Sequence, residues 1–518
     1  MRRGLRRRGM TAPNSQGHAD RAATLIFGTV LAAIADAAIP IALVRLLPKE
    51  EVGVLAALLV VYATVSLGFL AGLPDVILYY LPTRSAGERR AIAGLTARTL
   101  FCFGAITGLV LILLPMLGQH FSFLLRPFSL GPSSGNSGSS PVGYFAMLAF
   151  YPLGDLPARM LPNLLVLEGR TRAAAWISIG QSLTRTLACV VPPLAGLGIG
   201  AVVTSLSLTG FLSLAVVGIV LHRLYRKTPR RSSPVSLGEL LRFGLPLNLT
   251  NLVSSLNGSV DRYLVMFAFT PRDFAEYQAA AWQIPFVTTI AYTVGTACAP
   301  RFTEMFKGGR PQEAVDLWRR GAVKVSLVVF PVALIAAITA EEILQLLFTS
   351  AYLRGATVFR LYSLITLGRV AAFGTLLVCA GRPRLILQSA VGTLVTSVVF
   401  SVPLLALLGF NGPAYGALLA FVVTVAIYCR AIATAAGLSW RRIFPLAQLS
   451  RVLAVVLLAG APALAFKLLG NFPPLATVVG VGVITLSGFL LLGTLTGVVL
   501  REDWRRIASW TRLGFLRG

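Results

Sequence analysis

Long apolar stretches recur along the whole chain, and short polar segments separate them. Each stretch has roughly 20 to 30 residues, enough for an α-helix to cross about 30 Å of hydrocarbon at about 1.5 Å per residue. The pattern predicts an all-α integral membrane protein. About fourteen transmembrane helices are predicted over residues 22–47, 52–81, 91–119, 142–168, 173–197, 199–224, 237–268, 274–306, 315–340, 358–380, 385–408, 415–434, 444–469 and 475–500.

The positions of the charges support a membrane protein. The 518 residues are 56% hydrophobic and only 13% charged, about half the charged share of a soluble domain. A net charge of +27 would suggest nucleic acid as the partner of a soluble protein. Here Lys and Arg gather in both tails and in every second loop, whereas loops such as 409–413 and 470–474 lack them. The positive-inside rule therefore predicts a multi-pass protein with both termini in the cytoplasm and no nucleic-acid partner.

The loops are short and leave no room for a soluble catalytic domain. A basic linker separates six predicted helices from the next six. The predicted organisation is a basic cytoplasmic tail (1–21), an N-lobe (22–226), a cytoplasmic linker (227–236), a C-lobe (237–438), helices 13 and 14 (439–500) and a cytoplasmic tail (501–518). Similar turns, PKE at 48–50 and PRD at 271–273, follow the first and seventh helices. They favour a parallel repeat, although proline and charge also punctuate membrane loops in general.

Ionisable side chains within predicted helices are the clearest indication of function. A charge at the bilayer centre costs about 2.5 to 3.5 kcal/mol on insertion scales, so it usually faces protein or a watery cavity. The helix predicted over 173–197 has a polar stripe that includes Arg185, and the helix over 237–268 has one that includes Arg262; both stripes have helical spacing. Asp155 and Arg159 are four residues apart, close enough to pair.

Two interpretations of these residues stay open. In the first, a water-filled cavity between the halves binds an anionic substrate. Its candidate lining residues are Arg98, Arg159, Arg185, Arg262, Arg369, Gln181, Asn248 and Asn251. In the second, the polar groups bridge neighbouring helices and Asp–Arg pairs neutralise each other. The carboxylates Asp36, Asp75 and Glu276 are candidates for coupling to a proton or sodium gradient.

Catalytic signatures are absent from the sequence. The three histidines, His18, His120 and His222, are far apart and have no metal-ligand spacing. The sequence has no G-x-x-x-x-G-K-[ST] loop for ATP. It therefore predicts a transporter rather than an enzyme, with no catalytic residue, no metal and no bound cofactor.

Several short patterns carry a family resemblance. They are RLLPKEEVG at 45–53, LRFGLP at 241–246, DRY at 261–263, EILQLLFTSAY at 342–352, GRP at 381–383 and GFNGPAYG at 409–416. Their order and spacing, over roughly residues 21–438, resemble the polysaccharide (Wzx-type) flippases of the MOP (multidrug/oligosaccharidyl-lipid/polysaccharide) exporter superfamily. The sequence departs from that pattern at Thr349, where glycine is common, and at Tyr415, where a smaller residue is usual.

The resemblance implies two six-helix lobes in a V plus two C-terminal helices, in a bacterial or archaeal inner membrane. It implies that alternating access moves an undecaprenyl-pyrophosphate-linked oligosaccharide from the cytoplasmic to the outer leaflet, for O-antigen or exopolysaccharide biosynthesis. The implied partners are this polyprenyl-pyrophosphate-linked glycan and membrane lipid, with a glycan polymerase as a further candidate. The alternatives are a lipid II flippase, a MATE-type multidrug exporter and, from another class, a membrane polymerase or ligase.

Overall fold

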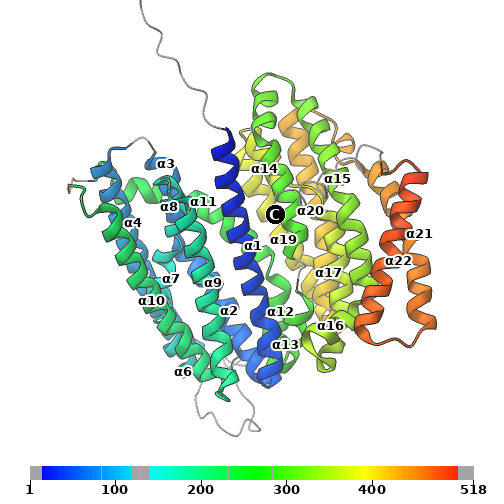
Figure 1. Ribbon diagram of the computed structural model, residues 1–518, viewed down its shortest axis with the longest axis horizontal. Helices are drawn as coiled ribbons and strands as arrows, with labels where there is room; N and C mark the ends of the chain where they lie inside the picture. Colours follow the sequence, from blue (N-terminus) through cyan, green and yellow to red (C-terminus); the bar gives the residue numbers. More distant parts are fainter. Residues whose placement is uncertain are drawn as a thin grey trace, which may run out of the picture. The chain divides into compact units, whose positions relative to one another are not determined.

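The computed structural model describes residues 15–82, 84–118, 128, 141–229, 233–282 and 285–499. Every regular element in these ranges is helical (Figure 1). Each of the fourteen predicted segments corresponds there to one helix or to a series of short helices. Eight spans among the described residues are long and apolar enough to cross a membrane, judged by length and composition. The all-α, multi-pass membrane fold predicted from the sequence is therefore confirmed.

Most predicted segments form one long helix. These helices are α1 (Ser15–Leu46), α4 (Ala86–Gly118), α9 (Thr171–Leu194), α10 (Ile199–Tyr225), α15 (Pro311–Ile338), α19 (Pro383–Leu408), α20 (Gly412–Ala436), α21 (Leu446–Leu469) and α22 (Pro474–Leu495). Short helices connect some of them, namely α16 (Ala340–Phe348), η2 (Ser350–Gly355), η3 (Gly409–Asn411) and η4 (Trp440–Arg442).

Five predicted segments are divided into shorter helices. They are α2 (Lys49–Leu70) with α3 (Leu73–Tyr80); α6 (Pro141–Leu148) with α7 (Pro152–Ala158) and α8 (Leu161–Leu167); α11 (Leu237–Asn257) with α12 (Val260–Ala268); α13 (Pro271–Ala280) with α14 (Pro285–Lys307); and α17 (Ala356–Gly368) with α18 (Phe373–Cys379). Hydropathy continues across these breaks, so the apolar pattern alone does not reveal them.

The breaks follow from local sequence. Ala71 and Gly72 have positive φ angles of 51° and 67°, which end α2 before α3 begins. Pro152 stands at the start of α7, where its missing N–H is tolerated. Asn257, Gly258 and Ser259 are poor helix formers, and they divide α11 from α12. The polar stripe expected on one uninterrupted helix from Asn248 to Arg262 is thus split between two helices, which corrects the sequence-based expectation.

The chain divides into two compact units that interleave along the sequence. Unit 1 contains Met1–Ala42, Phe69–Leu113 and Gly143–Pro246, and unit 2 contains Leu43–Gly68, Leu114–Val142 and Leu247–Gly518. The first part of α1 thus belongs to unit 1, whereas most of α2 belongs to unit 2. The lobe boundaries drawn from the sequence stay a prediction.

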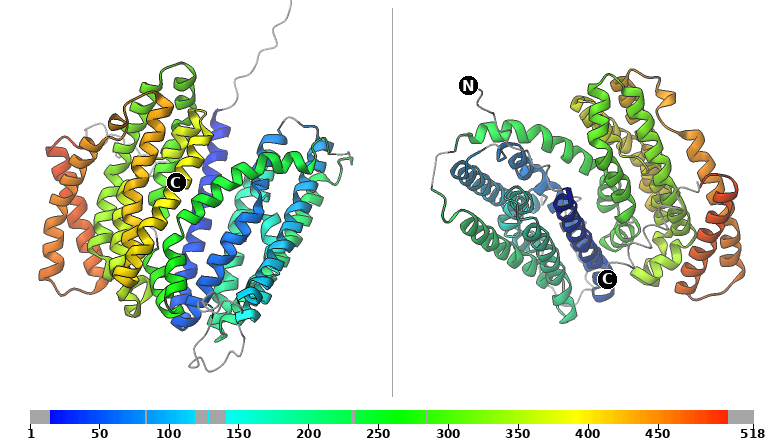
Figure 2. Two further views of the ribbon diagram at one scale, coloured as in Figure 1. Left: turned by 180° about the vertical axis from the view of Figure 1, so that it is seen from behind. Right: turned by 45° about the horizontal axis from the view of Figure 1, so that its top comes forward.

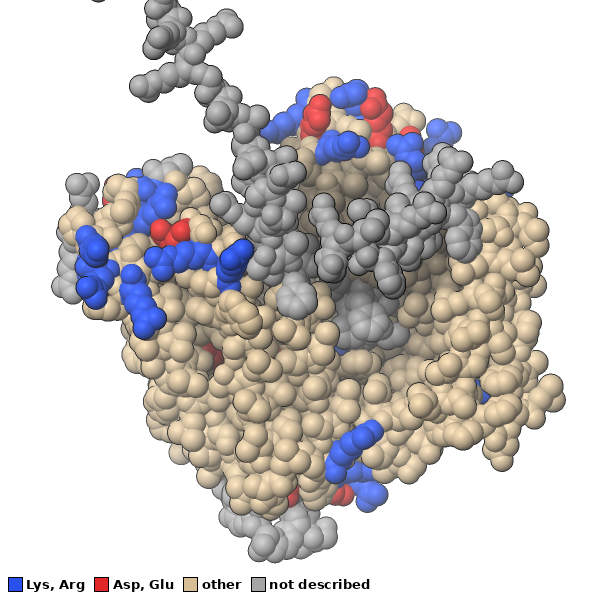
Figure 3. Space-filling model, in the orientation of Figure 1, with Lys and Arg blue, Asp and Glu red and all other residues tan. Residues whose placement is uncertain are grey.

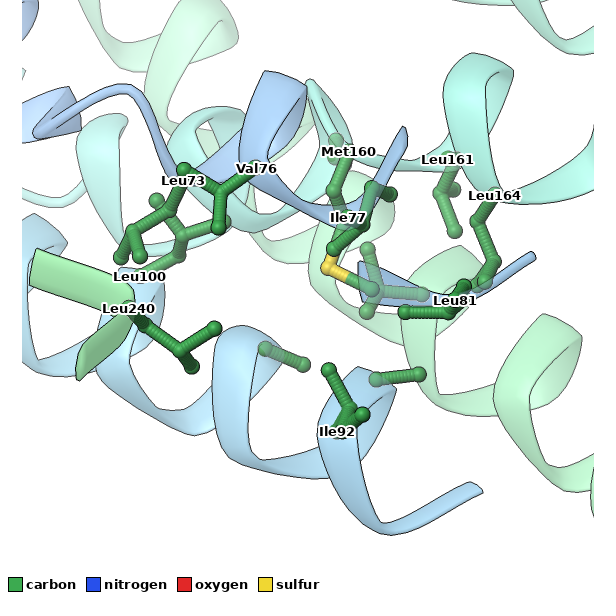
Figure 4. Packing of buried hydrophobic residues seen from close by; sticks show 14 of the residues in the cluster. Leu73, Val76, Ile77, Leu81, Ile92, Leu100, Met160, Leu161, Leu164 and Leu240 are labelled. Carbon is green, nitrogen blue, oxygen red and sulfur yellow. The ribbon is translucent and has the colours of Figure 1, made fainter. Parts of the chain in front are cut away.

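The core of unit 1 forms where α3, α4, α8 and α11 meet. Leu73, Ile77, Leu100 and Leu164 are fully buried in it (Figure 4). Gly72 allows α11 to approach, because a Cβ there would lie only 2.5 Å from the carbonyl oxygen of Gly244. In a bilayer such a core is stabilised by close packing rather than by exclusion of water.

Unit 2 contains most of α2 and the helices from α12 onwards, and α21 and α22 pack on α15 and α16. The two C-terminal helices, orange to red, lie together at the edge of unit 2 in both views of Figure 2. Val325, Val456 and Phe489 are buried where α15, α21 and α22 meet. The ammonium of Lys467 lies 2.9 Å from a carboxylate oxygen of Glu342, which connects α21 to α16.

The two turns of similar sequence lie side by side in unit 2. A Cβ on Gly53 would lie 1.8 Å from the carbonyl oxygen of Pro271, so only glycine permits this approach. Ion pairs surround the contact and join Lys49 to Glu276, Arg272 to Glu50 and Arg354 to Asp273. We call these six charged residues the turn cluster. Loops predicted on the same side of the membrane therefore meet at one end of unit 2.

The turn cluster also caps a helix. The Thr270 hydroxyl accepts a hydrogen bond from the Asp273 backbone, and Asp273 accepts one in return, forming a capping box at the start of α13. Burial raises the pKa of Asp273, but the hydrogen bonds from Thr270 and Arg354 outweigh burial and hold this pKa below its ordinary value. The carboxylate therefore stays charged and continues to bind Arg354 in mildly acidic solution.

Thr349 has a backbone conformation that favours glycine, with φ 78° and ψ 163°. This region is essentially reserved for glycine, and a residue with a Cβ there is strained by about 1 to 3 kcal/mol. We expect Thr349→Gly to stabilise the protein by about 1 kcal/mol after the entropy of the unfolded glycine is subtracted. Reversible unfolding in mixed micelles measures this difference. Thr349→Ala is the control, because it retains a Cβ and should give no gain; equal stabilisation by both variants would contradict the strain.

Candidate functional site

A polar pocket lies inside unit 1, among α1, α7, α9 and α10. Its volume is about 230 Å³, room for roughly eight waters at about 30 Å³ each. The lining residues are Ala32, Tyr151, Asp155, Ala158, Arg159, Ser178, Gln181, Ser182, Thr184, Arg185, Thr209 and Ser213. We call this cavity the unit 1 pocket. It is large enough for a small polar group but not for an oligosaccharide.

Helix α9 provides the polar stripe that its sequence predicts. Ser178, Gln181 and Arg185 recur at intervals of three or four residues, so they share one face of the helix, and all three line the pocket. The side-chain amide of Gln181 also donates a hydrogen bond to the carbonyl of Ala158 at 3.3 Å. The stripe therefore lines a cavity and joins α9 to α7 at the same time.

Arg185 forms an ion pair with Asp36 of α1. Its Nη2 lies 2.6 Å from Oδ2 of Asp36, and the Ser182 hydroxyl donates to the same oxygen at 3.1 Å. The other oxygen of Asp36 is buried and has no hydrogen-bond partner among the described residues. Asp36 thus lies behind the pocket wall and orients the Arg185 guanidinium.

Arg159 pairs with Asp155, as their spacing predicts. Its Nε and Nη2 donate to Oδ2 of Asp155 at 3.0 and 2.8 Å, and the Tyr151 hydroxyl donates to Oδ1 at 3.3 Å. Helix α7 ends at Ala158, so Arg159 is its C-cap, where the helix dipole favours a cation. Three residues one turn apart thus build one polar wall of the pocket.

The two ion pairs balance the charges of the unit 1 pocket. Two arginines and two aspartates sum to no net formal charge, which agrees with the interpretation that Asp–Arg pairs neutralise each other. A guanidinium has five N–H donors in a planar fork. An anion that enters the pocket would compete with Asp36 and Asp155 for these donors. The pocket can therefore exchange an internal carboxylate for an external anion.

A second polar cluster lies in unit 2, around the buried carboxylate of Asp261 on α12. The hydroxyls of Tyr277 and Tyr362 both donate to Oδ2 of Asp261. Arg262 follows Asp261 on the same helix, and Arg369 is the C-cap of α17. The charges of the two arginines lie close enough to repel each other. The structure thus brings Arg262 and Arg369 together, as neighbours of a carboxylate that two tyrosines bind.

Two predicted asparagines lie outside these clusters. Asn248 is buried, and its amide donates to the carbonyl of Leu67 on α2 at 2.8 Å. It therefore bridges two helices of unit 2, as the second interpretation of the polar residues expects. Asn251, three residues later, is exposed.

The remaining carboxylates have different surroundings. Asp75 is exposed on α3 and accepts a hydrogen bond from the amide of Asn163 at 3.2 Å. Glu276 is buried in the turn cluster, 2.6 Å from the ammonium of Lys49. Among the described residues, no three side chains of His, Cys, Asp or Glu gather as metal ligands would.

Arg98 lines another pocket of unit 1, between α4 and α10. The two pockets share no lining residue. The structure therefore places Arg98 in a different pocket of unit 1 from the one that Arg159 and Arg185 line. Arg98 lies on an exposed face of α4. The hydropathy of the sequence does not reveal which way this side chain points.

Three tyrosines were missed by the sequence analysis. Tyr151 precedes Asp155 by four residues, so helical spacing gave a signal for this contact. Tyr277 and Tyr362 reach Asp261 from α13 and α17, and no local pattern indicates that these helices meet. Tyrosine is also common at membrane interfaces, so its presence alone predicts no polar cluster.

The fold is similar to those of solved lipid II flippase and MATE family transporter structures. The structure of the lipid II flippase MurJ in an inward closed conformation has a TM-score of 0.68 at 12% identity, over 92% of this chain and 98% of that one. An inward-facing MATE family multidrug resistance transporter has a TM-score of 0.58 at 15% sequence identity, over 79% of this chain and 96% of that one. A MOP superfamily transporter from Pyrococcus furiosus has a TM-score of 0.52 at 16% sequence identity, over 80% of this chain and 94% of that one.

A family model also matches part of the sequence. Residues 170–357 match the model of a family described as polysaccharide biosynthesis protein. Together with the shared fold, this match confirms the resemblance to polysaccharide flippases of the MOP superfamily. No curated protein sequence matches the chain.

Proposed function

We propose that this protein moves an undecaprenyl-pyrophosphate-linked oligosaccharide from the cytoplasmic to the outer leaflet by alternating access. The observation that carries the proposal is the unit 1 pocket, where Arg159 and Arg185 line one cavity inside an apolar helical unit. The match to a polysaccharide biosynthesis family and the fold shared with a lipid II flippase support it. A pyrophosphate is the chemical group that these arginines would recognise.

The chemistry of binding follows from the guanidinium group. Phosphate oxygens accept two parallel hydrogen bonds from one arginine, and such charge-assisted bonds are roughly twice as strong as neutral ones. Their Coulomb attraction is stronger in an apolar helical unit than in water. The pocket has room for the pyrophosphate, so the glycan would extend out of it. The polyprenyl tail would stay in lipid.

The Asp36–Arg185 pair also provides a means of coupling. A proton on Asp36 would remove its negative charge and weaken its hold on Arg185. The released guanidinium would then be available to the pyrophosphate. Among the three candidate carboxylates, Asp36 alone pairs with an arginine of this pocket, so we propose that a proton gradient acts here rather than at Asp75 or Glu276. A sodium ion at the same carboxylate is the alternative.

The basic loops support an inner-membrane location with both termini in the cytoplasm, in a bacterium or archaeon. In that orientation the glycan would enter from the side where lipid-linked sugars are assembled. After release it would face the outer leaflet, where a glycan polymerase is the partner that we propose.

Lipid II transport is the second candidate, because the MurJ structure covers nearly the whole chain. Lipid II also carries a polyprenyl pyrophosphate, so the unit 1 pocket suits both substrates. The two differ in the sugar, which the pocket is too small to enclose. A test must therefore identify the lipid rather than only the pyrophosphate.

Deletion of the gene in its own organism separates these functions. We expect a polyprenyl-pyrophosphate-linked oligosaccharide to accumulate and the surface glycan to disappear, with lipid II unchanged, as measured by mass spectrometry of extracted lipids. The wild-type gene should restore the glycan. Accumulation of lipid II would instead favour the second candidate. If neither lipid accumulated, both proposals would be wrong.

A further inference from the structure

Unit 1 contains a second, larger pocket, on the surface between α4 and α10. Its volume is about 390 Å³, and we call it the α4–α10 pocket. The lining residues are Arg90, Ala91, Gly94, Leu95, Arg98, Leu221, His222, Tyr225 and Ser233. The proposed translocation does not use this site, because it shares no residue with the unit 1 pocket.

The charge of this pocket differs from that of the unit 1 pocket. Two arginines and a histidine line it, and no carboxylate does. Arg90 is held in place at the end of α10, where it donates to the carbonyls of Tyr225 and Thr228. Arg98 and His222 are exposed and make no ion pair or hydrogen bond with any described residue. The pocket therefore has cationic groups for which the described part of the chain provides no counterion.

The acid that contacts the pocket residue Tyr225 does not pair with the pocket's arginines. Glu168 accepts a hydrogen bond from the Tyr225 hydroxyl at 3.0 Å and lies 3.8 Å from Arg89. It does not line the pocket. Lys and Arg side chains of unit 1 gather at one end, next to a broad, mostly uncharged surface (Figure 3). The excess of positive charge at this end is what the basic loops predict for the cytoplasmic side.

Exposed apolar stripes extend from the pocket along both helices. On α4, Arg98 is followed at helical spacing by Phe101, Leu109 and Leu113, all exposed. On α10, exposed leucine and isoleucine side chains precede His222 at the same spacing, namely Leu208, Leu212 and Ile219. Each stripe thus has a basic side chain at one end and hydrocarbon along the rest. This pattern matches a molecule with an anionic head and long apolar chains.

An exposed arginine on a membrane helix requires an explanation. Arg98 lies 7 residues after Ala91, where the predicted membrane segment of α4 begins, which corresponds to roughly 10 Å along the helix. At that depth, or close to it, the guanidinium needs either water or an anion. Basic pockets between transmembrane helices on the cytoplasmic side are known to hold lipid headgroups.

We propose that the α4–α10 pocket binds the phosphate of an anionic membrane phospholipid. Arg98 and Arg90 donate hydrogen bonds to the phosphate oxygens, and His222 closes the site from α10. The acyl chains lie along the two apolar stripes. The bound lipid joins α4 to α10 and supplies the counterion for Arg98.

Native mass spectrometry of the purified full chain tests this site. The protein is mixed with short-chain phosphatidylglycerol or, as the neutral comparison, phosphatidylcholine. We expect wild-type protein to retain phosphatidylglycerol preferentially, and Arg98→Gln to bind it at least tenfold more weakly. Arg172→Gln, an exposed arginine of α9 in the same unit that lines neither pocket, is the matched control and should bind as the wild type does. Equal binding by Arg98→Gln and wild type would overturn the proposal.

Two further arms identify the source of the phosphate. Inorganic phosphate at millimolar concentration should not displace the lipid, because it lacks the chains that lie on the stripes. A short polyprenyl pyrophosphate should compete no better than phosphatidylglycerol. If inorganic phosphate displaced the lipid, the pocket would be a general anion site. Preferential binding of the polyprenyl pyrophosphate would assign the pocket to substrate, and either result would overturn the phospholipid assignment.

Discussion

Arg185→Ala should lower surface glycan by roughly 10- to 100-fold in cells that depend on this protein for its export. The change removes one of the two guanidinium groups of the unit 1 pocket, and a charged hydrogen bond contributes about 1.5 to 3 kcal/mol. It also leaves the Asp36 carboxylate without its cation, next to the pocket that must attract an anion. The measurement is the amount of surface glycan, normalised to the amount of folded protein in the membrane.

Two variants separate recognition from stability. Arg185→Gln combined with Asp36→Asn removes both charges, so it should restore any lost stability without restoring transport. Arg172→Ala, on the same helix but outside the pocket, should leave the surface glycan unchanged. Wild-type glycan levels in cells with Arg185→Ala would remove Arg185 from the proposed site.

Lys49→Met should destabilise the protein by about 3 to 5 kcal/mol. The ammonium of Lys49 lies 2.6 Å from Glu276, and the two side chains are only 15% and 7% exposed. Removing one partner of a buried ion pair leaves an uncompensated charge, which is strongly destabilising. Reversible unfolding in mixed micelles gives the difference in the free energy of unfolding.

Matched variants of the turn cluster complete this test. Replacing Lys49 and Glu276 together with methionine should recover most of the loss, because no buried charge remains. Arg272→Met removes a more exposed ion pair, with side chains 62% and 38% exposed, and should change stability by less than about 1 kcal/mol. Similar losses for Lys49→Met and Arg272→Met would show that burial does not determine the effect.

Much of the fold was predictable because hydropathy and charge directly reflect the bilayer. The length of each apolar stretch locates the membrane helices. The helical periodicity of polar residues in α9 places Gln181 and Arg185 on one face. The departure at Thr349 also marked a real feature, a glycine-type backbone conformation. The helix breaks were not predictable from apolar pattern, because Gly258 and Ser259 interrupt the helix without interrupting the hydrophobic run.

The candidate site was only partly predictable. Asp155 and Arg159 pair through local spacing, which a single sequence reveals. Asp36 and Arg185 are separated by 149 positions, and their contact depends on which faces of α1 and α9 oppose each other. The same limit explains why Arg98 was grouped with the other arginines. The sequence shows that a charged residue lies in the middle of a helix, but tertiary packing determines which neighbouring helix its side chain faces.

Translocation by the purified protein tests the central proposal most directly. Vesicles are reconstituted with a fluorescent polyprenyl-pyrophosphate-linked oligosaccharide in both leaflets, and a membrane-impermeant quencher is added outside. With wild-type protein we predict that the inner-leaflet label becomes accessible to the quencher, whereas a labelled phosphatidylcholine does not. If folded wild-type protein leaves the inner-leaflet glycan lipid protected, as in protein-free vesicles, and imposed proton or sodium gradients change nothing, the proposed flippase activity is contradicted.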